Sequence, residues 1–243
     1  SNGVLMSTAS WAFQTPVLSE QYQVLLYDCR GMWQSEHPPG PYSMELHADD
    51  LAGLLDELGI ERAHVGGISY GGEVSMTFAL RYPERTRSLI VSSAVSRVDR
   101  LLQGWMESWM VAVEAKDAET FFRISYPTNF SEAWIAANQP ALDLARQRYD
   151  TLNYDSFREL LLAFSAIDIT ADLHSIETPT LVIVGEEDIL KPRKYSEIIA
   201  GEIAGAEFAV VPHAGHAVLW EQPALFNSLI LGFLSKHVDR ESV

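Results

Sequence analysis

The sequence is poor in cysteine and has no long apolar run. Its one cysteine, Cys29, cannot form an internal disulfide, which fits a reducing compartment. No stretch reaches the roughly 20 apolar residues that a membrane-spanning helix needs. We therefore expect a cytoplasmic protein without a membrane partner.

Positive charge is also scarce. The chain holds 17 lysines and arginines against 33 aspartates and glutamates, a formal net charge of −16. This balance argues against nucleic acid as a partner, because Lys and Arg supply the phosphate contacts. An anionic small molecule is still possible, since one local arginine can outweigh a distant field screened by salt. The seven histidines are scattered without metal-ligand spacing, so we expect no metal and no cofactor.

Strand-like and helix-like segments alternate along most of the chain, which predicts an α/β fold with a mostly parallel sheet and helices on both faces. The 243 residues, 47% of them hydrophobic, suit one such core with an insertion. The expected strands are Gln23–Tyr27, Ala63–Ile68, Ser88–Val91, Thr180–Val184 and Glu207–Val211. The expected helices are Ser43–Leu58, Tyr70–Arg81, Pro192–Ile203 and Pro223–Lys236.

The strand pattern stops between residues 96 and 172, which predicts a helical cap inserted into a core formed by residues 1–95 and 173–243. Two apolar faces at helical spacing carry this prediction. One contains Leu101, Trp105, Trp109 and Val113, and the other contains Tyr154, Phe157, Leu161 and Phe164. Such aromatics either pack the core of the cap or line an apolar pocket beneath it. Trp105 and Trp109 are the best pocket candidates, because they stand one helical turn apart.

Ser69 is the candidate nucleophile. It lies in the sequence Gly-Ile-Ser-Tyr-Gly at residues 67–71, after an apolar run and before a helix-like stretch. A serine that leaves a strand through so tight a turn needs neighbours without Cβ atoms, and the glycines two residues before and after it meet that need.

An acid and a base follow in the order expected for such a serine. Asp188 comes three residues after Gly185, where a buried strand ends, and His216 follows the next strand. Two other acids and one other histidine compete for these roles: Glu186, Glu187 and His213. The spacing favours Asp188 as the acid and His216 as the base.

With these motifs the chain resembles the α/β-hydrolase superfamily over its whole length, and especially its capped esterases, enol-lactonases and carbon–carbon hydrolases. The Tyr-Asp-Cys-Arg-Gly turn at residues 27–31 and the Glu-Gln-Pro at residues 221–223 also match family patterns. The resemblance implies a Ser69–His216–Asp188 triad and a small-molecule acyl substrate. It also implies an oxyanion hole made by the backbone N–H groups of Tyr70 and Val4.

Departures from the family pattern leave other readings open. Trp33 replaces a common glycine and becomes a candidate substrate contact, and Asn2-Gly3 replaces a common His-Gly. Asn-Gly followed by small residues is similar to acyltransferases that join hydroxyacyl chains, so acyl transfer is an alternative to hydrolysis. A ligand-binding receptor on the same fold is the alternative from another class.

Two further expectations concern the region around these motifs. By the resemblance, three strands precede Asn2, and the third of them lies in the sheet between the strands that end at Asp28 and Ile68, so we expect that the sequence lacks an N-terminal segment that contains these strands. Asp28 and Arg30 are expected to form a structural ion pair that braces their turn.

Overall fold

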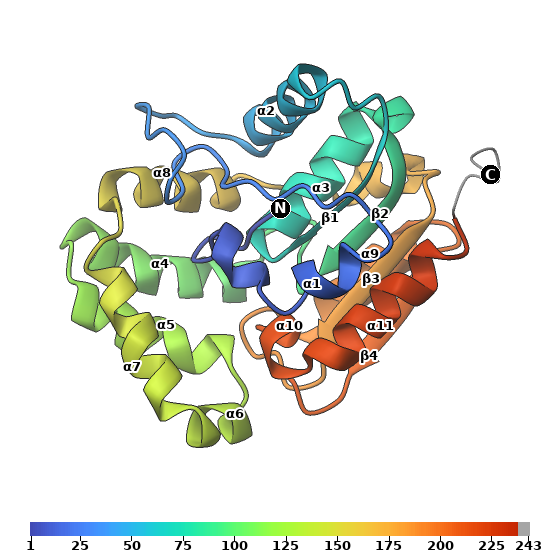
Figure 1. The fold of residues 1–243 in the computed structure, drawn as a ribbon. Coiled ribbons are helices and arrows are strands. Elements are labelled where there is room, and N and C mark those ends of the chain that lie inside the picture. Colours follow the sequence, from blue (N-terminus) through green and yellow to red (C-terminus); the bar gives the residue numbers. More distant parts are fainter. Residues whose placement is uncertain (238–243) are drawn as a thin grey trace.

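The computed structural model describes residues 1–237 and has a central parallel sheet (Figure 1). Its strands are hydrogen-bonded in the order β1-β2-β3-β4, with every neighbouring pair parallel. They are β1 (Ala63–Ile68), β2 (Thr86–Ser92), β3 (Thr180–Gly185) and β4 (Glu207–Val211). Because the strands run the same way, their carboxyl ends, which precede the candidate site residues, meet at one edge.

Helices cover both faces of the sheet, as the alternation of elements predicted. Alternate strand residues point to opposite faces, and Ile90 and Ile183 pack against α11 (Pro223–Leu234). Leu89 and Val182 face the other way, toward a cluster built with α3 (Tyr70–Arg81) and α9 (Arg193–Glu202). A further helix, α2 (Met44–Glu57), packs on α3.

The predicted core helices are confirmed to within two residues at each end. Ser43 caps α2, since its hydroxyl accepts a hydrogen bond from the Leu46 N–H at 3.1 Å. The short elements of the core are η1 (Thr8–Trp11), α1 (Thr15–Leu18), η2 (Pro83–Arg85), η3 (Thr170–Ser175) and α10 (Val218–Glu221).

Between β2 and β3 the chain forms a helical insertion, which lies to one side of the sheet (Figure 1). Its helices are α4 (Arg100–Glu114), α5 (Ala118–Asn129), α6 (Glu132–Ala137), α7 (Gln139–Tyr149) and α8 (Tyr154–Ser165). The apolar face of α8 is buried as expected, whereas on α4 Leu101 is 44% exposed. Phe121 of α5 is fully buried and contacts aromatic rings from α4, α7 and α8.

The two ends of the insertion lie side by side. The Ile169 N–H donates to the Ser96 carbonyl at 2.8 Å, and the hydroxyls of Ser96 and Thr170 lie 2.7 Å apart. Arg97 and Asp168 form an isolated antiparallel bridge. We call residues 96–98 and 167–170 the stem of the insertion.

The strand expected at Gln23–Tyr27 is wrong, because residues 23–29 pair with no other strand. A strand needs a neighbour to complete its hydrogen bonds. Between this segment and β1 lies Ser1, whose nitrogen donates to the Gly66 carbonyl at 2.6 Å and whose hydroxyl is 2.9 Å from that of Tyr27. These contacts do not make a ladder of backbone hydrogen bonds along residues 23–27.

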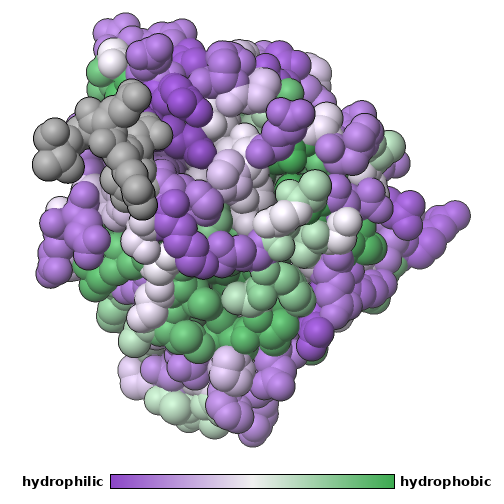
Figure 2. All heavy atoms as spheres, turned by 90° about the vertical axis from the view of Figure 1, so that its right-hand side faces the viewer, coloured by the Kyte–Doolittle hydropathy of each residue, from purple (hydrophilic) through white to green (hydrophobic). Residues whose placement is uncertain are grey.

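One face of the outer surface is mostly hydrophilic. On the face shown in Figure 2, hydrophilic residues predominate and hydrophobic residues gather mainly below the centre. Within residues 1–237, no helix has the length and apolar character required to cross a membrane.

Candidate active site

Ser69 occupies a strained turn between β1 and α3. Its φ of 55° and ψ of −122° are unfavourable for a residue with a side chain. The flanking glycines are required by space, because a Cβ on Gly67 would lie 2.2 Å from the Gly71 carbonyl oxygen. The geometry is therefore that of the predicted nucleophile elbow, with Ser69 at the N-terminus of α3.

Asp188 and His216 are in contact and nearly excluded from solvent. The His216 Nδ1 lies 2.8 Å from Asp188 Oδ2, and the two residues are 4% and 5% exposed. The other carboxylate oxygen of Asp188 accepts the Lys191 backbone N–H at 2.8 Å. The loops that carry the two residues touch, since a Cβ on Gly185 would lie 2.1 Å from the Gly215 carbonyl oxygen.

The competing residues lie outside this arrangement. The His213 side chain is 81% exposed, and its nearest carboxylate, that of Glu187, is 3.9 Å away. Glu186 accepts only a long, 3.4 Å hydrogen bond from the His213 backbone N–H. Their positions favour the assignments made from spacing.

Ser69 and His216 line the same cavity, between the sheet edge and the insertion. Its volume is about 1210 Å³ including its opening to solvent. Gly3, Val4 and Tyr70 lie on its wall, as do all three predicted pocket residues, Trp33, Trp105 and Trp109. Most of the remaining lining is apolar, including Leu102, Met106, Phe122, Leu142, Leu161 and Phe164.

The loop before Val4 is held by a buried polar network. The Asn2 amide donates to Asp28 Oδ1 at 2.8 Å and accepts the Trp11 indole N–H at 2.7 Å. Gly71 lets this loop approach the elbow, because a Cβ there would lie 2.8 Å from the Asn2 carbonyl oxygen. Val4 and Tyr70, whose N–H groups were predicted to form the oxyanion hole, both line the cavity, and Tyr70 is in the first turn of α3, where an N–H has no intrahelical acceptor.

The expected ion pair of Asp28 with Arg30 is wrong. Arg30 instead donates its Nε to Asp50 of α2 at 2.8 Å. Asp28 is already occupied, because its carboxylate accepts the Asn2 amide and the backbone N–H groups of Thr8 and Gln34. Two residues of one turn therefore brace different parts of the core.

The Tyr70 side chain is fixed by a histidine that sequence reasoning missed. Its hydroxyl lies 2.8 Å from His47 Nε2, and both residues are buried. Burial lowers the pKa of His47 to about 4, so the ring that is hydrogen-bonded to the Tyr70 hydroxyl is neutral. This contact helps to hold the residue that follows the elbow serine.

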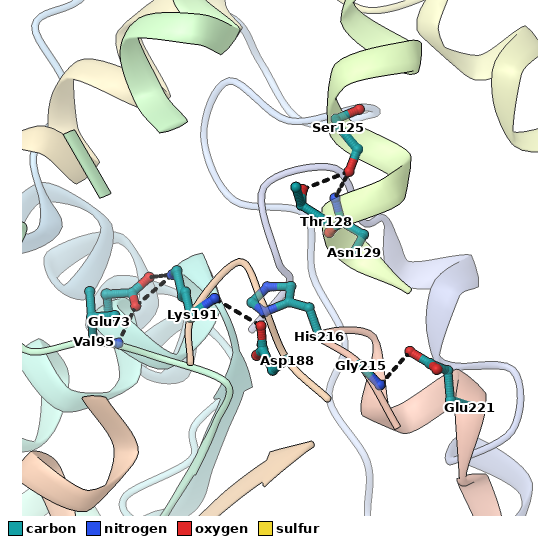
Figure 3. A network of polar contacts seen from close by, with 10 residues as sticks. All are labelled: Glu73, Val95, Ser125, Thr128, Asn129, Asp188, Lys191, Gly215, His216 and Glu221. Atoms are coloured by element: carbon teal, nitrogen blue, oxygen red, sulfur yellow. Dashed lines mark hydrogen bonds and ion pairs between the residues drawn. The ribbon is translucent and has the colours of Figure 1, made fainter. Parts of the chain in front are cut away.

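Glu221, the first residue of the Glu-Gln-Pro motif, joins the histidine loop to the insertion. One of its carboxylate oxygens accepts the Gly215 N–H at 3.0 Å, and the other accepts the Ser131 N–H at 3.1 Å. The Ala217 N–H also donates to the Asn129 carbonyl at 2.8 Å. His216 is therefore positioned partly by the insertion, and Figure 3 shows the Glu221–Gly215 hydrogen bond beside it.

A second missed pair lies beside Asp188. The Lys191 ammonium contacts both carboxylate oxygens of Glu73 at 2.8 and 3.0 Å, and the two side chains are 5% and 0% exposed. Glu73 also accepts the Val95 N–H at 2.8 Å. The pair links α3, which begins after Ser69, to the loop of Asp188 (Figure 3). The sequence signal for this pair was Glu73 itself, which is the only charged residue before Arg81 in the helix that follows Ser69.

Comparison with known proteins places this geometry in a family. The sequence matches the family described as the alpha/beta hydrolase fold over residues 2–223, most of the chain. The chain belongs to the α/β-hydrolase fold family. The predicted fold class and superfamily resemblance are thereby confirmed.

Individual members of the family align over nearly the whole chain. A Caulobacter segnis protein named "Putative carbamate hydrolase RutD" is 31% identical over 240 residues, covering 96% of this chain and 89% of its own. The crystal structure of MGS-M2, an alpha/beta hydrolase from a deep-sea metagenome library, superposes with a TM-score of 0.93 at 28% identity, covering 100% of this chain and 90% of its own. The enol-lactonase from Burkholderia xenovorans LB400 gives 0.91 at 27% identity, with coverages of 97% and 89%. These relatives support hydrolysis as the general activity.

Proposed function

We propose that this protein is a serine hydrolase that cleaves a carboxylic ester, lactone or thioester, or a carbon–carbon bond beside a carbonyl. The observation that carries the proposal is the His216–Asp188 contact at 2.8 Å, with Ser69 lining the same apolar cavity as His216. Ser69 is the nucleophile, His216 the general base and Asp188 its partner.

In the first half of the reaction, the Ser69 oxygen attacks the substrate carbonyl carbon while His216 takes the serine proton. Asp188 holds His216 with Nδ1 protonated, which leaves Nε2 free to act as the base, and stabilises the imidazolium that forms. The tetrahedral oxyanion accepts hydrogen bonds from the N–H groups of Tyr70 and Val4. Collapse of the intermediate expels the leaving group, which takes the proton from His216, and leaves an acyl-enzyme.

In the second half, water replaces the leaving group and His216 again acts as the base. The Ser69 ester is hydrolysed through a second oxyanion held by the same two donors, and the acid product leaves. Each donor is expected to contribute about 3–4 kcal/mol of transition-state stabilisation, because it is in place before charge develops.

The apolar lining of the cavity supports an acyl or ring group of medium size as the substrate. The names of the relatives add carbamates and enol-lactones to the substrates worth testing, and both are attacked at a carbonyl carbon. We assign the helical insertion, within the predicted range 96–172, the role of a cap that selects the substrate.

The test combines covalent labelling with a substrate panel. A fluorophosphonate should label the wild-type protein at Ser69, because only an activated serine attacks phosphorus readily, and labelling should be absent from Ser69→Ala. The wild type should turn over at least one member of a panel of esters, lactones, thioesters and carbamates. Ser69→Ala should turn over none of them. Labelling that persists at another residue of the variant would refute the assignment of Ser69.

The two tryptophans of α4 are expected to respond differently to truncation. Trp109 is 6% exposed and packs edge-on against Phe121, with ring centroids 5.5 Å apart, whereas Trp105 is only partly buried. Trp109→Ala should therefore lower the free energy of unfolding by about 3–5 kcal/mol. Trp105→Ala should cost less stability and should shift the preferred acyl chain length, measured on a series of para-nitrophenyl esters. An unchanged chain-length profile in Trp105→Ala would reject its role in the pocket.

A further inference from the structure

Arg148 is a cation in the wall of a mostly apolar cavity, whose other cation, Lys191, is paired with Glu73. It lies on α7, next to the end of that helix, and is half-buried. Its guanidinium carbon stands 4.1 Å from the centroid of the Trp33 ring, and its Nη2 donates to the Ser7 hydroxyl at 3.1 Å. Stacking and this hydrogen bond fix the plane of the guanidinium beside the cavity.

The guanidinium has no carboxylate partner within residues 1–237, although acidic residues are abundant in the chain. Seven other arginines do pair with a carboxylate within 4.0 Å: Arg30, Arg81, Arg85, Arg123, Arg146, Arg158 and Arg193. Burial lowers the pKa of Arg148, which agrees with a cation that has lost solvent without gaining a counter-charge.

The acidic groups that act on Arg148 are the Tyr149 phenol, whose pKa burial raises, and the Asp28 carboxylate. The field of Asp28 favours the charged guanidinium, but Asp28 is not within ion-pair distance. Its two oxygens already accept hydrogen bonds from Asn2, Thr8 and Gln34. Most of the five N–H donors of Arg148 are therefore left for a bound molecule.

We propose that Arg148 binds a carboxylate group of the substrate, so that the enzyme acts on acyl compounds that carry a negative charge away from the reacting carbonyl. The inference rests on the proposed function for the identity of the reacting bond. A planar guanidinium meets a carboxylate through two parallel hydrogen bonds, and a desolvated site strengthens them. The apolar lining then holds the carbon chain between the two polar ends.

The test uses two pairs of esters that differ by one carboxylate. In the first pair the charge is on the acyl part, mono-para-nitrophenyl adipate against para-nitrophenyl hexanoate. In the second pair it is on the leaving group, para-hexanoyloxybenzoate against phenyl hexanoate. In at least one pair, Arg148→Met should lower the ratio of kcat/KM for the charged over the neutral ester by about 10- to 100-fold.

The matched control is Arg146→Met, on the same helix. It removes the same charge from a residue that is already paired with Glu119 and Asp150, so the ratio should not change. Arg148→Lys, which keeps the charge but loses the fork, should fall between wild type and Arg148→Met. Thermal unfolding confirms that each variant is folded. Ratios unaffected by Arg148→Met in both pairs would overturn the proposal.

A binding experiment separates this inference from the proposed function. If the wild type hydrolyses none of the four esters, the proposed reaction loses support, but the arginine site can still be tested by calorimetric titration with adipate. Adipate should bind at least tenfold more weakly to Arg148→Met than to wild type or Arg146→Met. No binding to the wild type, or equal binding to all three proteins, would overturn the assignment of Arg148.

Discussion

Replacing His216 with alanine should lower turnover of the best substrate by about 10⁴- to 10⁶-fold, because it removes the proposed base that takes the Ser69 proton. Asp188→Asn should cost about 10⁴-fold, since the amide favours the wrong tautomer of the imidazole. Both variants should remain folded. Turnover measured at saturating substrate, with residual rates compared to a Ser69→Ala blank, checks the prediction.

The matched control for His216 is His213, three residues upstream in the same loop. Its side chain is 81% exposed and is not part of the cavity lining. His213→Ala should therefore retain nearly all activity. If His213→Ala were inactive and His216→Ala active, the base would have to be reassigned to His213.

The second large effect is expected from the buried pair Glu73–Lys191. Lys191→Met removes the counter-charge from a carboxylate with no exposure to solvent, which should lower the free energy of unfolding by about 3–5 kcal/mol. The exposed pair Lys116–Asp155 supplies the control, and Lys116→Met should change stability by no more than about 1 kcal/mol. Urea titrations of the three proteins measure the difference.

The loss in Lys191→Met should also depend on pH. Burial raises the pKa of Glu73 and Lys191 opposes that rise, so removing the lysine raises the folded-state pKa further. A folded-state pKa above the unfolded value gives stability that is present at low pH and lost as pH rises. The deficit of Lys191→Met should therefore be larger at about pH 8 than at about pH 5. A deficit that does not vary with pH would show that Glu73 does not carry the cost.

Much of the core was predictable because its signals are local. A short apolar run followed by a loop with glycine, proline or polar residues predicts a strand, so β1, β3 and β4 follow from short windows of sequence. Residues 67–71 are equally local, since steric limits at Ser69 determine the residues on either side.

Contacts between distant segments could not be read in this way. Glu73 and Lys191 are 118 residues apart, and Arg148 approaches Ser7 across 141 residues. The ion pair expected between Asp28 and Arg30 failed for the same reason, because sequence proximity says nothing of a third residue, Asp50, that competes from α2. Residues 23–27 have the composition of a strand, but pairing depends on what lies beside them.

The stem of the insertion has a consequence for how such proteins diversify. Because the insertion begins beside Ser96 and ends beside Ile169, and these two residues are joined by a 2.8 Å hydrogen bond, we expect that the intervening helices can be exchanged as a unit between homologues without disturbing strand order. Exchanging the insertion at these two positions would replace much of the cavity lining and leave Ser69 unchanged. It would also carry away Arg148 but leave Trp33, its stacking partner, behind. The effects of mutations in the insertion should therefore depend on the residues of the core loop that carries Trp33. An exchanged insertion should need matched changes in that loop for full activity.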